Sequence, residues 1–282
     1  MSAADKIGIL GSGSDQTAFA FNVGVPSIMY YFLVDKQKYN KFSGFYPTYH
    51  TGFETFYLVD KILDPGFKTS RSCAQLGLHM ALQLADTPVL QTSLEDMTSL
   101  IEETLTGFEN STFPSLRKYG AGDSVDVLIK AFHKFKAAAS KFSAERDAMV
   151  TMVRNMEDTP ELALKYNLHL HIYFLIVSSY IHCDLHIPRR RILNDKLLQL
   201  ERIFLLPGGL PGRPHYKHAL FSPSKFNSYA GAVFPGLADA MHGFHDLVEE
   251  EMMETVKEVK KHLSDVMMTF RQAAGWLTGP GI

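Results

Sequence analysis

The sequence has few cysteines and no long apolar segment. Cys73 and Cys183 are the only cysteines among the 282 residues, too few for a framework of disulfide bonds, so we expect packing to hold the fold together. The strongest apolar run, residues 172–181, is about half the roughly 20 residues that a membrane-spanning helix needs. The residues after Met1 lack the basic start and apolar centre of a signal peptide. The sequence alone leaves the cellular compartment open.

The sequence also lacks an excess of positive charge. Its formal net charge is −2, which argues against a nucleic-acid-binding protein, because binding to phosphates needs a basic face. Hydrophobic residues make up 46% and charged residues 21%, the balance expected of a globular chain that buries a core. The length suits one large domain or two of modest size.

The first part of the chain mixes strand and helix signals. Residues 6–10 and 25–34 are apolar and predict strands, and a tight glycine loop at 11–15 follows the first of them. Residues 17–23 and 53–63 predict short helices. Strands and helices in this order are typical of the last units of an α/β domain.

From residue 67 onward the pattern becomes helical. Residues 67–84 are apolar on most sides and predict a buried helix. Ser93 can cap the next helix, and Asp123 opens a longer one with apolar residues at spacings of three and four. A further stripe runs from Leu193 to Phe204, and the last follows residues 252–273. Four such stripes predict a helical bundle.

Three groups of residues match one family in both order and spacing. They are residues 10–15 (LGSGSD); residues 41–44, 46–50, 54–55 and 64–65; and residues 193–197, 200–202, 213–214, 216, 218, 229–231 and 234–236. In these positions the chain resembles glutamate carboxypeptidase II and its N-acetylated-α-linked acidic dipeptidase-like relatives, the zinc metallopeptidases related to the transferrin receptor. The match spans most of the chain.

The resemblance implies a fold, a cofactor and a partner. Residues 1–87 would be the C-terminal segment of an α/β zinc exopeptidase domain, and residues 88–282 an all-α helical bundle that forms a homodimer. The family carries two zinc ions and releases C-terminal residues or dipeptides from peptide substrates. By family, the protein would be secreted or lie on the extracellular face of the plasma membrane. Asn110, Ser111 and Thr112 form an acceptor sequence for N-glycosylation, although such triplets also occur by chance.

Two adjacent residues match the catalytic machinery of the family. His50 corresponds to its last zinc-binding histidine, and neutral imidazole is a good zinc ligand. Tyr49 corresponds to a tyrosine whose hydroxyl stabilises the tetrahedral intermediate. Without the resemblance, the pair would be interpreted as an ordinary loop histidine and a half-buried loop tyrosine with no catalytic role.

Other residues match the family's substrate cleft. Ser12, Gly13 and Ser14 correspond to the loop that lines the cleft near the metals, and Tyr229 to a tyrosine in the pocket for the substrate's C-terminal residue. For Tyr229, simple packing is an equally good interpretation. A dinucleotide-binding loop is ruled out, because Gln16 stands where that motif requires its third glycine.

The chain also departs from the family pattern. The other zinc ligands and the glutamate general base lie before the glycine loop in the family, and here Asp5 is the only candidate ligand in that stretch. We therefore expect the isolated chain to be inactive as a peptidase. Ser228 replaces a lysine that binds the substrate carboxylate, and no arginine precedes Arg71, so preference for acidic substrates is doubtful. Residues 165–190 have no counterpart in the family and are interpreted as an insertion, whose histidines and Cys183 fit no standard metal spacing.

Two classes of function remain open. The first is a C-terminal fragment of a zinc exopeptidase that carries one zinc ligand and the dimerisation domain. The second is a non-catalytic, dimerising interaction protein like the transferrin receptor. Retention of Tyr49 and His50 favours the first, because a receptor does not need a zinc ligand. A short form that acts only by dimerising, with itself or with full-length subunits, is a third possibility.

Overall fold

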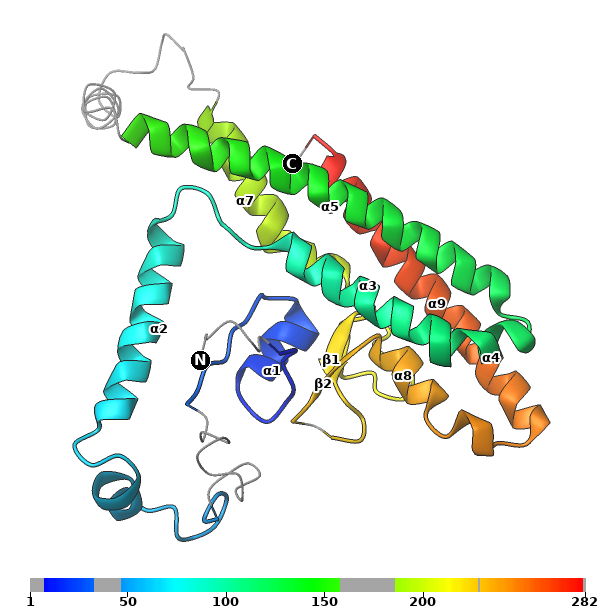
Figure 1. The fold of residues 1–282 in the computed structure, drawn as a ribbon, viewed down its shortest axis with the longest axis horizontal. Coiled ribbons are helices and arrows are strands. Elements are labelled where there is room, and N and C mark those ends of the chain that lie inside the picture. The colour runs from blue at the N-terminus through cyan, green and yellow to red at the C-terminus, as the bar shows by residue number, and fades with distance from the viewer. Residues whose placement is uncertain (1–7, 33–46, 158–185, 228, 281–282) are drawn as a thin grey trace. The chain divides into compact units, whose positions relative to one another are not determined.

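The chain folds into two compact units in a computed structural model that describes residues 8–32, 47–157, 186–227 and 229–280 (Figure 1). The larger unit comprises residues 1–27 and 88–282, and the smaller comprises residues 28–87. The sequence predicts a peptidase segment up to residue 87 and a helical domain from residue 88. This assignment of the two domains stays a prediction. None of the described helices has both the length and the apolar character needed to cross a membrane.

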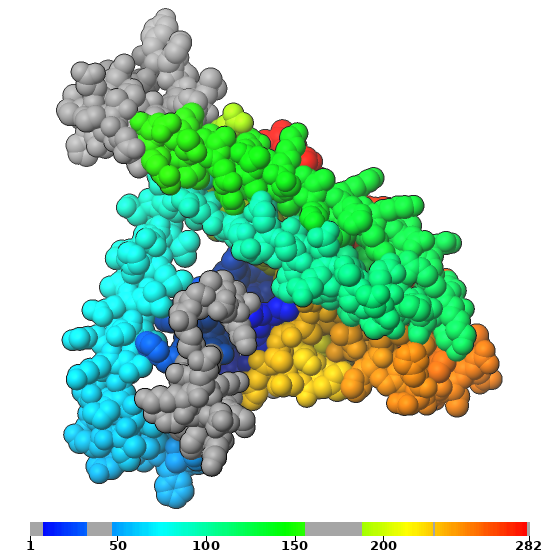
Figure 2. All heavy atoms as spheres, in the orientation of Figure 1, coloured from blue at the N-terminus to red at the C-terminus, as the bar shows by residue number. Residues whose placement is uncertain are grey.

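Helices make up most of the larger unit. Its long helices α5 and α9 pack side by side (Figure 1), and the atoms of α3 and α5 form a continuous surface in Figure 2. The only sheet described is an antiparallel hairpin in which Phe221 pairs with Val233 and Pro223 with Gly231. The elements are α1 (Gln16–Ala18), η2 (Phe19–Val23), α3 (Leu94–Ser111), α4 (Phe113–Lys118), α5 (Gly122–Glu157), α7 (His186–Ile203), β1 (Phe221–Pro223), β2 (Gly231–Val233), α8 (Pro235–Met241), η4 (Phe244–Asp246) and α9 (Glu249–Thr278).

An aromatic cluster forms the centre of this unit. Phe270 of α9 is fully buried. Its ring centroid lies 5.6 Å from those of Phe132 and Phe135 on α5. The ring centroids of Phe204 and Phe234 each lie 6.2 Å from that of Phe270. Most of these ring pairs are edge-to-face, a geometry that adds to the free energy gained from burying the rings. The predicted helical bundle is confirmed, and rings from α5 and from the segments that follow α7 and precede α8 meet at Phe270.

The helix ends follow from local side-chain chemistry. The Ser93 hydroxyl accepts a hydrogen bond from the backbone N–H of Asp96 at 3.2 Å, which is the predicted N-cap of α3. The Glu251 carboxylate accepts from the backbone N–H of Val248 at 3.3 Å at the start of α9. At the other end of α9, the Lys196 ammonium donates to the carbonyl groups of Leu277 at 3.0 Å and Gly279 at 2.6 Å. A cation at this position interacts favourably with the C-terminal end of the helix dipole.

The family-matching residues 193–197 therefore have a structural role. Burial lowers the pKa of Lys196, and the Glu145 carboxylate acts against that shift. The Asn194 side chain accepts from the backbone N–H of Leu90 at 2.9 Å and donates to the carbonyl of Pro88 at 3.1 Å. Two residues in the same turn of α7 thus hold the end of α9 and the segment that leads into α3.

The smaller unit contains η3 (Leu58–Leu63) and α2 (Lys68–Asp86). The Asp64 carboxylate accepts hydrogen bonds from the backbone N–H groups of Thr69 at 2.9 Å and Ser70 at 2.8 Å, near the start of α2. These bonds lower the pKa of Asp64 to about 2. Asp64, from the family-matching Asp64–Pro65 pair, thus stabilises the start of α2.

Three sequence predictions fail in this part of the chain. The expected strand over residues 25–34 is irregular over its described part, 25–32, and residues 8–10 are irregular as well. A strand needs a hydrogen-bonding neighbour, and the described residues offer neither segment one. The helix α2 was expected to be buried, yet none of its residues is, and Leu78 and Leu82 are exposed. The α/β character of residues 1–87 is therefore not confirmed.

A buried histidine gives the larger unit a specific pH dependence. His262 of α9 is buried, and both of its ring nitrogens lack a hydrogen-bond partner among the described residues. A Cβ on Gly236 of α8 would lie 2.3 Å from its Nε2 atom, so the α8 backbone closes over the ring. Burial lowers the pKa of His262 to about 4, and the Asp265 carboxylate opposes that shift.

We predict that acid destabilises the larger unit through His262. Below pH 6.5 the unfolded chain binds a proton at this residue and the folded chain does not, so the free energy of unfolding falls as the pH falls towards 4. Between pH 7 and pH 5 the loss is about 2 kcal/mol. Urea unfolding of the wild type and of His262→Leu at both pH values isolates this contribution. An equal loss in both proteins would contradict the assignment to His262.

Candidate functional site

The glycine loop and Tyr229 lie against each other in the larger unit. A Cβ on Gly11 would lie 2.2 Å from the carbonyl oxygen of Tyr229, and a Cβ on Gly13 would lie 3.0 Å from its Cε1 atom. Only residues without a side chain permit this approach of the two segments. The structure therefore brings Ser12, Gly13 and Ser14 together with Tyr229, although more than 200 residues separate them along the chain.

Local hydrogen bonds shape the loop. The Gln16 side chain donates to the carbonyl of Gly11 at 3.3 Å, and the Thr17 hydroxyl donates to the carbonyl of Ser14 at 2.8 Å. Both bonds connect the loop to α1, which begins directly after it. Two polar side chains at the start of the helix thus restrict the conformation of the loop, which its glycines alone would leave flexible.

The β1–β2 hairpin positions Tyr229 at its connecting turn. The backbone N–H of Ser224 donates to the carbonyl of Ala230 at 2.8 Å, and that of Tyr229 donates to the Asn227 side chain at 3.2 Å. The Tyr229 residue is 50% exposed. It therefore presents an accessible aromatic surface beside the loop, as a wall of a binding site would.

A buried ion pair holds this hairpin to α8. The Arg213 guanidinium lies 2.5 Å from the Asp239 carboxylate, and both side chains are about nine-tenths buried. Arg213 also donates to the carbonyl of Pro223 in β1 at 2.8 Å. Its cation lies 5.3 Å from the ring centroid of Tyr216. Removing one partner of such a pair costs about 3–5 kcal/mol, so the position of the hairpin depends on Arg213.

A second buried pair lies beside a cavity that the sequence did not predict. His218 Nε2 lies 2.7 Å from the Glu201 carboxylate. The Nδ1 atom accepts from the backbone N–H groups of Leu220 at 3.3 Å and Phe221 at 3.1 Å. This network places the ring proton on Nε2, where it is donated to Glu201. Both residues belong to the family-matching positions, and this was the only sequence signal for them.

The cavity has a volume of about 770 Å³ and is lined by both apolar and acidic side chains. Phe21, Met97 and Leu100 supply apolar walls, and Asp96, Glu103 and Glu201 supply carboxylates. Such a lining suits an apolar or cationic group better than an anion. It does not include Ser12, Gly13, Ser14 or Tyr229.

Tyr49 and His50 lie together in the smaller unit. Their rings are stacked, with centroids 3.9 Å apart and planes at 20°. The backbone N–H of His50 donates to the Glu54 carboxylate at 2.8 Å. His50 has a φ of +60°, a left-handed conformation that is uncommon outside glycine and clusters at functional sites. The His50 side chain is exposed and the Tyr49 side chain is half-buried.

The residues present do not by themselves form a zinc site. No group of three or more histidine, cysteine, aspartate or glutamate side chains that could hold a metal occurs in the described ranges 8–32, 47–157, 186–227 and 229–280. Zinc in proteins usually takes three or four protein ligands. His50 therefore fits as one ligand at most, and no catalytic step through a metal follows from this chain alone.

Some predicted features fall outside the described residues. These are Ser228, Asp5 and most of the expected insertion, including Cys183. The end of that segment is described, and residues 186–190 are the first turn of α7. These five residues are helical and continuous with the part of α7 that carries Asn194 and Lys196. The insertion of residues 165–190 relative to the family stays a prediction.

The chain is similar to one known domain family and to several known proteins. Residues 123–278 match the transferrin receptor-like dimerisation domain. The chain is 29% identical over 272 residues to the aminopeptidase NAALADL1 of Mus musculus, covering 96% of this chain and 31% of that protein. It is 28% identical over 247 residues to the probable glutamate carboxypeptidase LAMP1 of Arabidopsis thaliana, covering 88% of this chain and 29% of that protein. A glutamate carboxypeptidase 2 homolog of Caenorhabditis briggsae is 24% identical over 241 residues, with 85% and 28% covered.

The helical bundle and the family match together define the class of protein. The chain belongs to the transferrin receptor-like dimerisation domain family, and its relatives are glutamate carboxypeptidase-like peptidases. The resemblance predicted from the sequence is confirmed, and so is the helical dimerisation domain. The chain spans about a third of the length of the curated relatives that it matches.

We predict that Gly11→Ala disturbs the contact with Tyr229. The added methyl group would lie 2.2 Å from the Tyr229 carbonyl oxygen, so one of the two backbones must move, at a cost of about 1–3 kcal/mol. Hydrogen exchange at Tyr229 and Ala230 should become faster, and the urea midpoint should fall. The matched control is Gly275→Ala in α9, where nothing lies within 4 Å and alanine favours the helix. Unchanged exchange at Tyr229 in the Gly11 variant would contradict the contact.

Proposed function

We propose that this chain forms the C-terminal part of a homodimeric zinc exopeptidase that releases C-terminal residues or dipeptides from peptides. The observation that carries the proposal is the direct contact of the glycine loop with Tyr229. In this contact, residues that match two separate parts of the family's substrate cleft meet in the fold. The peptidase relatives and the dimerisation domain support the same assignment.

The larger unit would contribute to peptide binding. The half-exposed ring of Tyr229 offers an apolar surface for the substrate's last side chain. The loop with Ser12 and Ser14 offers hydroxyl and backbone groups that can donate hydrogen bonds to peptide carbonyl or carboxylate oxygens. Because Ser228 replaces the family's lysine and no arginine precedes Arg71, we propose a preference for apolar or mixed rather than acidic C-terminal residues.

The smaller unit would contribute to catalysis. His50 is proposed as one zinc ligand in a polypeptide that supplies the remaining ligands and the general base. The neighbouring Tyr49 is proposed to donate its hydroxyl proton in a hydrogen bond to the developing oxyanion. Stacking of the two rings at 3.9 Å supports this pairing, because it limits the rotation of both side chains.

The helical bundle would supply the contact between subunits. In a closed homodimer the same surface of each subunit is buried, and the match over residues 123–278 places the dimerisation domain on α5, α7, α8 and α9. We also propose, from the family, that the protein acts in an extracellular or secretory compartment.

The role of His50 is tested in a chimera. In it, the aligned third of the Mus musculus relative is replaced by this chain, so that the relative supplies the upstream residues. We expect the chimera to bind zinc and cleave peptides, and His50→Ala to lower both by at least tenfold, because zinc loses a ligand. The matched control is His133→Ala, which removes an exposed histidine of α5 and should leave both unchanged.

Two outcomes would count against the proposal. Full zinc content and activity in the His50→Ala chimera would show that His50 is not a ligand. A folded, dimeric chimera without zinc or activity would instead favour the alternative of a non-catalytic interaction protein like the transferrin receptor.

A further inference from the structure

Asn110 lies on the outer side of the last turn of α3. Phe108, two positions earlier, turns inward, with its ring centroid 5.7 Å from that of Phe113 and 6.1 Å from that of Phe234. Two residues along a helix differ by about 200° in direction, so Asn110 points away from this aromatic contact. Asn110 and Ser111 are both exposed.

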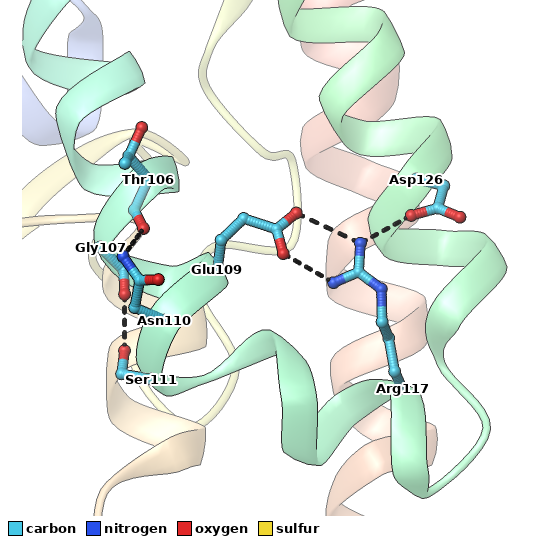
Figure 3. Close-up of polar contacts among 7 residues, drawn as sticks. All are labelled: Thr106, Gly107, Glu109, Asn110, Ser111, Arg117 and Asp126. Atoms are coloured by element: carbon cyan, nitrogen blue, oxygen red, sulfur yellow. Dashed lines mark hydrogen bonds and ion pairs between the residues drawn. The ribbon is translucent and has the colours of Figure 1, made fainter.

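An ion-pair network holds the other side of the same turn. Arg117 of α4 donates to both carboxylate oxygens of Glu109, at 2.9 and 3.2 Å, and to Asp126 of α5 at 2.8 Å. Figure 3 shows this network on one side of the turn and Asn110, Thr106 and Ser111 on the other. A substituent on Asn110 would therefore meet neither the core nor the ion pairs.

The local hydrogen bonds of Asn110 are compatible with a substituent on its side-chain nitrogen. One N–H of this amide donates to the carbonyl of Thr106 at 3.1 Å (Figure 3). A primary amide has two N–H groups, so replacing the other hydrogen leaves this bond intact. Thr112 supplies the hydroxyl that the acceptor sequence requires two residues later, and Ser111 between them is not proline.

We infer that Asn110 is the attachment site of an N-linked oligosaccharide. The side-chain nitrogen forms a bond to C1 of the sugar of a lipid-linked diphosphate oligosaccharide, and the bond from C1 to the diphosphate oxygen breaks. The diphosphate leaves with the electron pair, and the nitrogen releases one proton to a base of the transferase. Asn110 is the only asparagine followed at the second position by serine or threonine in the whole sequence, so a single glycan is expected.

A glycan on Asn110 would also limit which surfaces can take part in assembly. An oligosaccharide is bulky and hydrated, so it would keep the end of α3 and the adjoining surface of α4 free of any subunit contact. The inference rests on the proposed secretory location and is independent of peptidase activity.

The test is a mass measurement on the protein purified from eukaryotic cells that express it, before and after treatment with an amidase that removes N-linked glycans. We expect one glycan on the wild type, complete loss in Asn110→Gln and Thr112→Ala, and retention in Ser111→Ala and Thr112→Ser. The last two variants change the same turn but keep the acceptor sequence, so a loss caused by misfolding would be recognised.

A positive control distinguishes a failure of glycosylation at Asn110 from a protein that never enters the secretory pathway. Met253→Asn places an asparagine two residues before Thr255 at a position that is 53% exposed. A glycan on this variant at residue 253 alone, with none at 110, would overturn the inference while leaving the secretory location intact. No glycan at either position would overturn the secretory location and the inference with it. Neither result would bear on the role of His50.

Discussion

Phe270 packs between α5, α7 and the hairpin segment, and the architecture of the larger unit depends on that contact. Four phenylalanine rings lie with their centroids within 6.2 Å of the Phe270 centroid. They come from α5, from the end of α7 and from the residue before α8. Truncation of a fully buried phenylalanine costs about 3–5 kcal/mol, a large part of the net stability of a domain. One side chain thus links α5 and α9 with the residues that follow α7 and precede α8.

The candidate substrate-binding surface follows from this core in a short series of contacts. Phe234 packs on Phe270 and directly precedes α8. Asp239 of α8 pairs with Arg213, which donates to β1. The hairpin then holds Tyr229 against Gly11. The helical dimerisation domain and the candidate peptide-binding wall formed by Tyr229 and the glycine loop thus lie in one unit.

The sequence predicted the helices better than the strands, for a physical reason. Apolar spacing and the Ser93 cap are local signals, and they predicted helices where α3, α5, α7 and α9 lie, although α7 begins at His186, before the stripe that starts at Leu193. The strands expected at 6–10 and 25–34 depend on neighbours distant in sequence, and the described residues 8–10 and 25–32 are irregular. The burial expected for α2 failed for a similar reason, since apolar composition cannot supply a packing partner. The His218–Glu201 pair and the buried ring of His262 depend on tertiary contacts that no local pattern encodes.

In the proposed assembly, the helical bundle joins two copies of this chain. Sedimentation equilibrium of the purified, unglycosylated protein tests it most directly. The account predicts a mass of twice the chain's 31.7 kDa that falls towards a single chain only on dilution, as expected for a closed dimer. A mass of 31.7 kDa at every concentration, with the helices intact by circular dichroism, would contradict it.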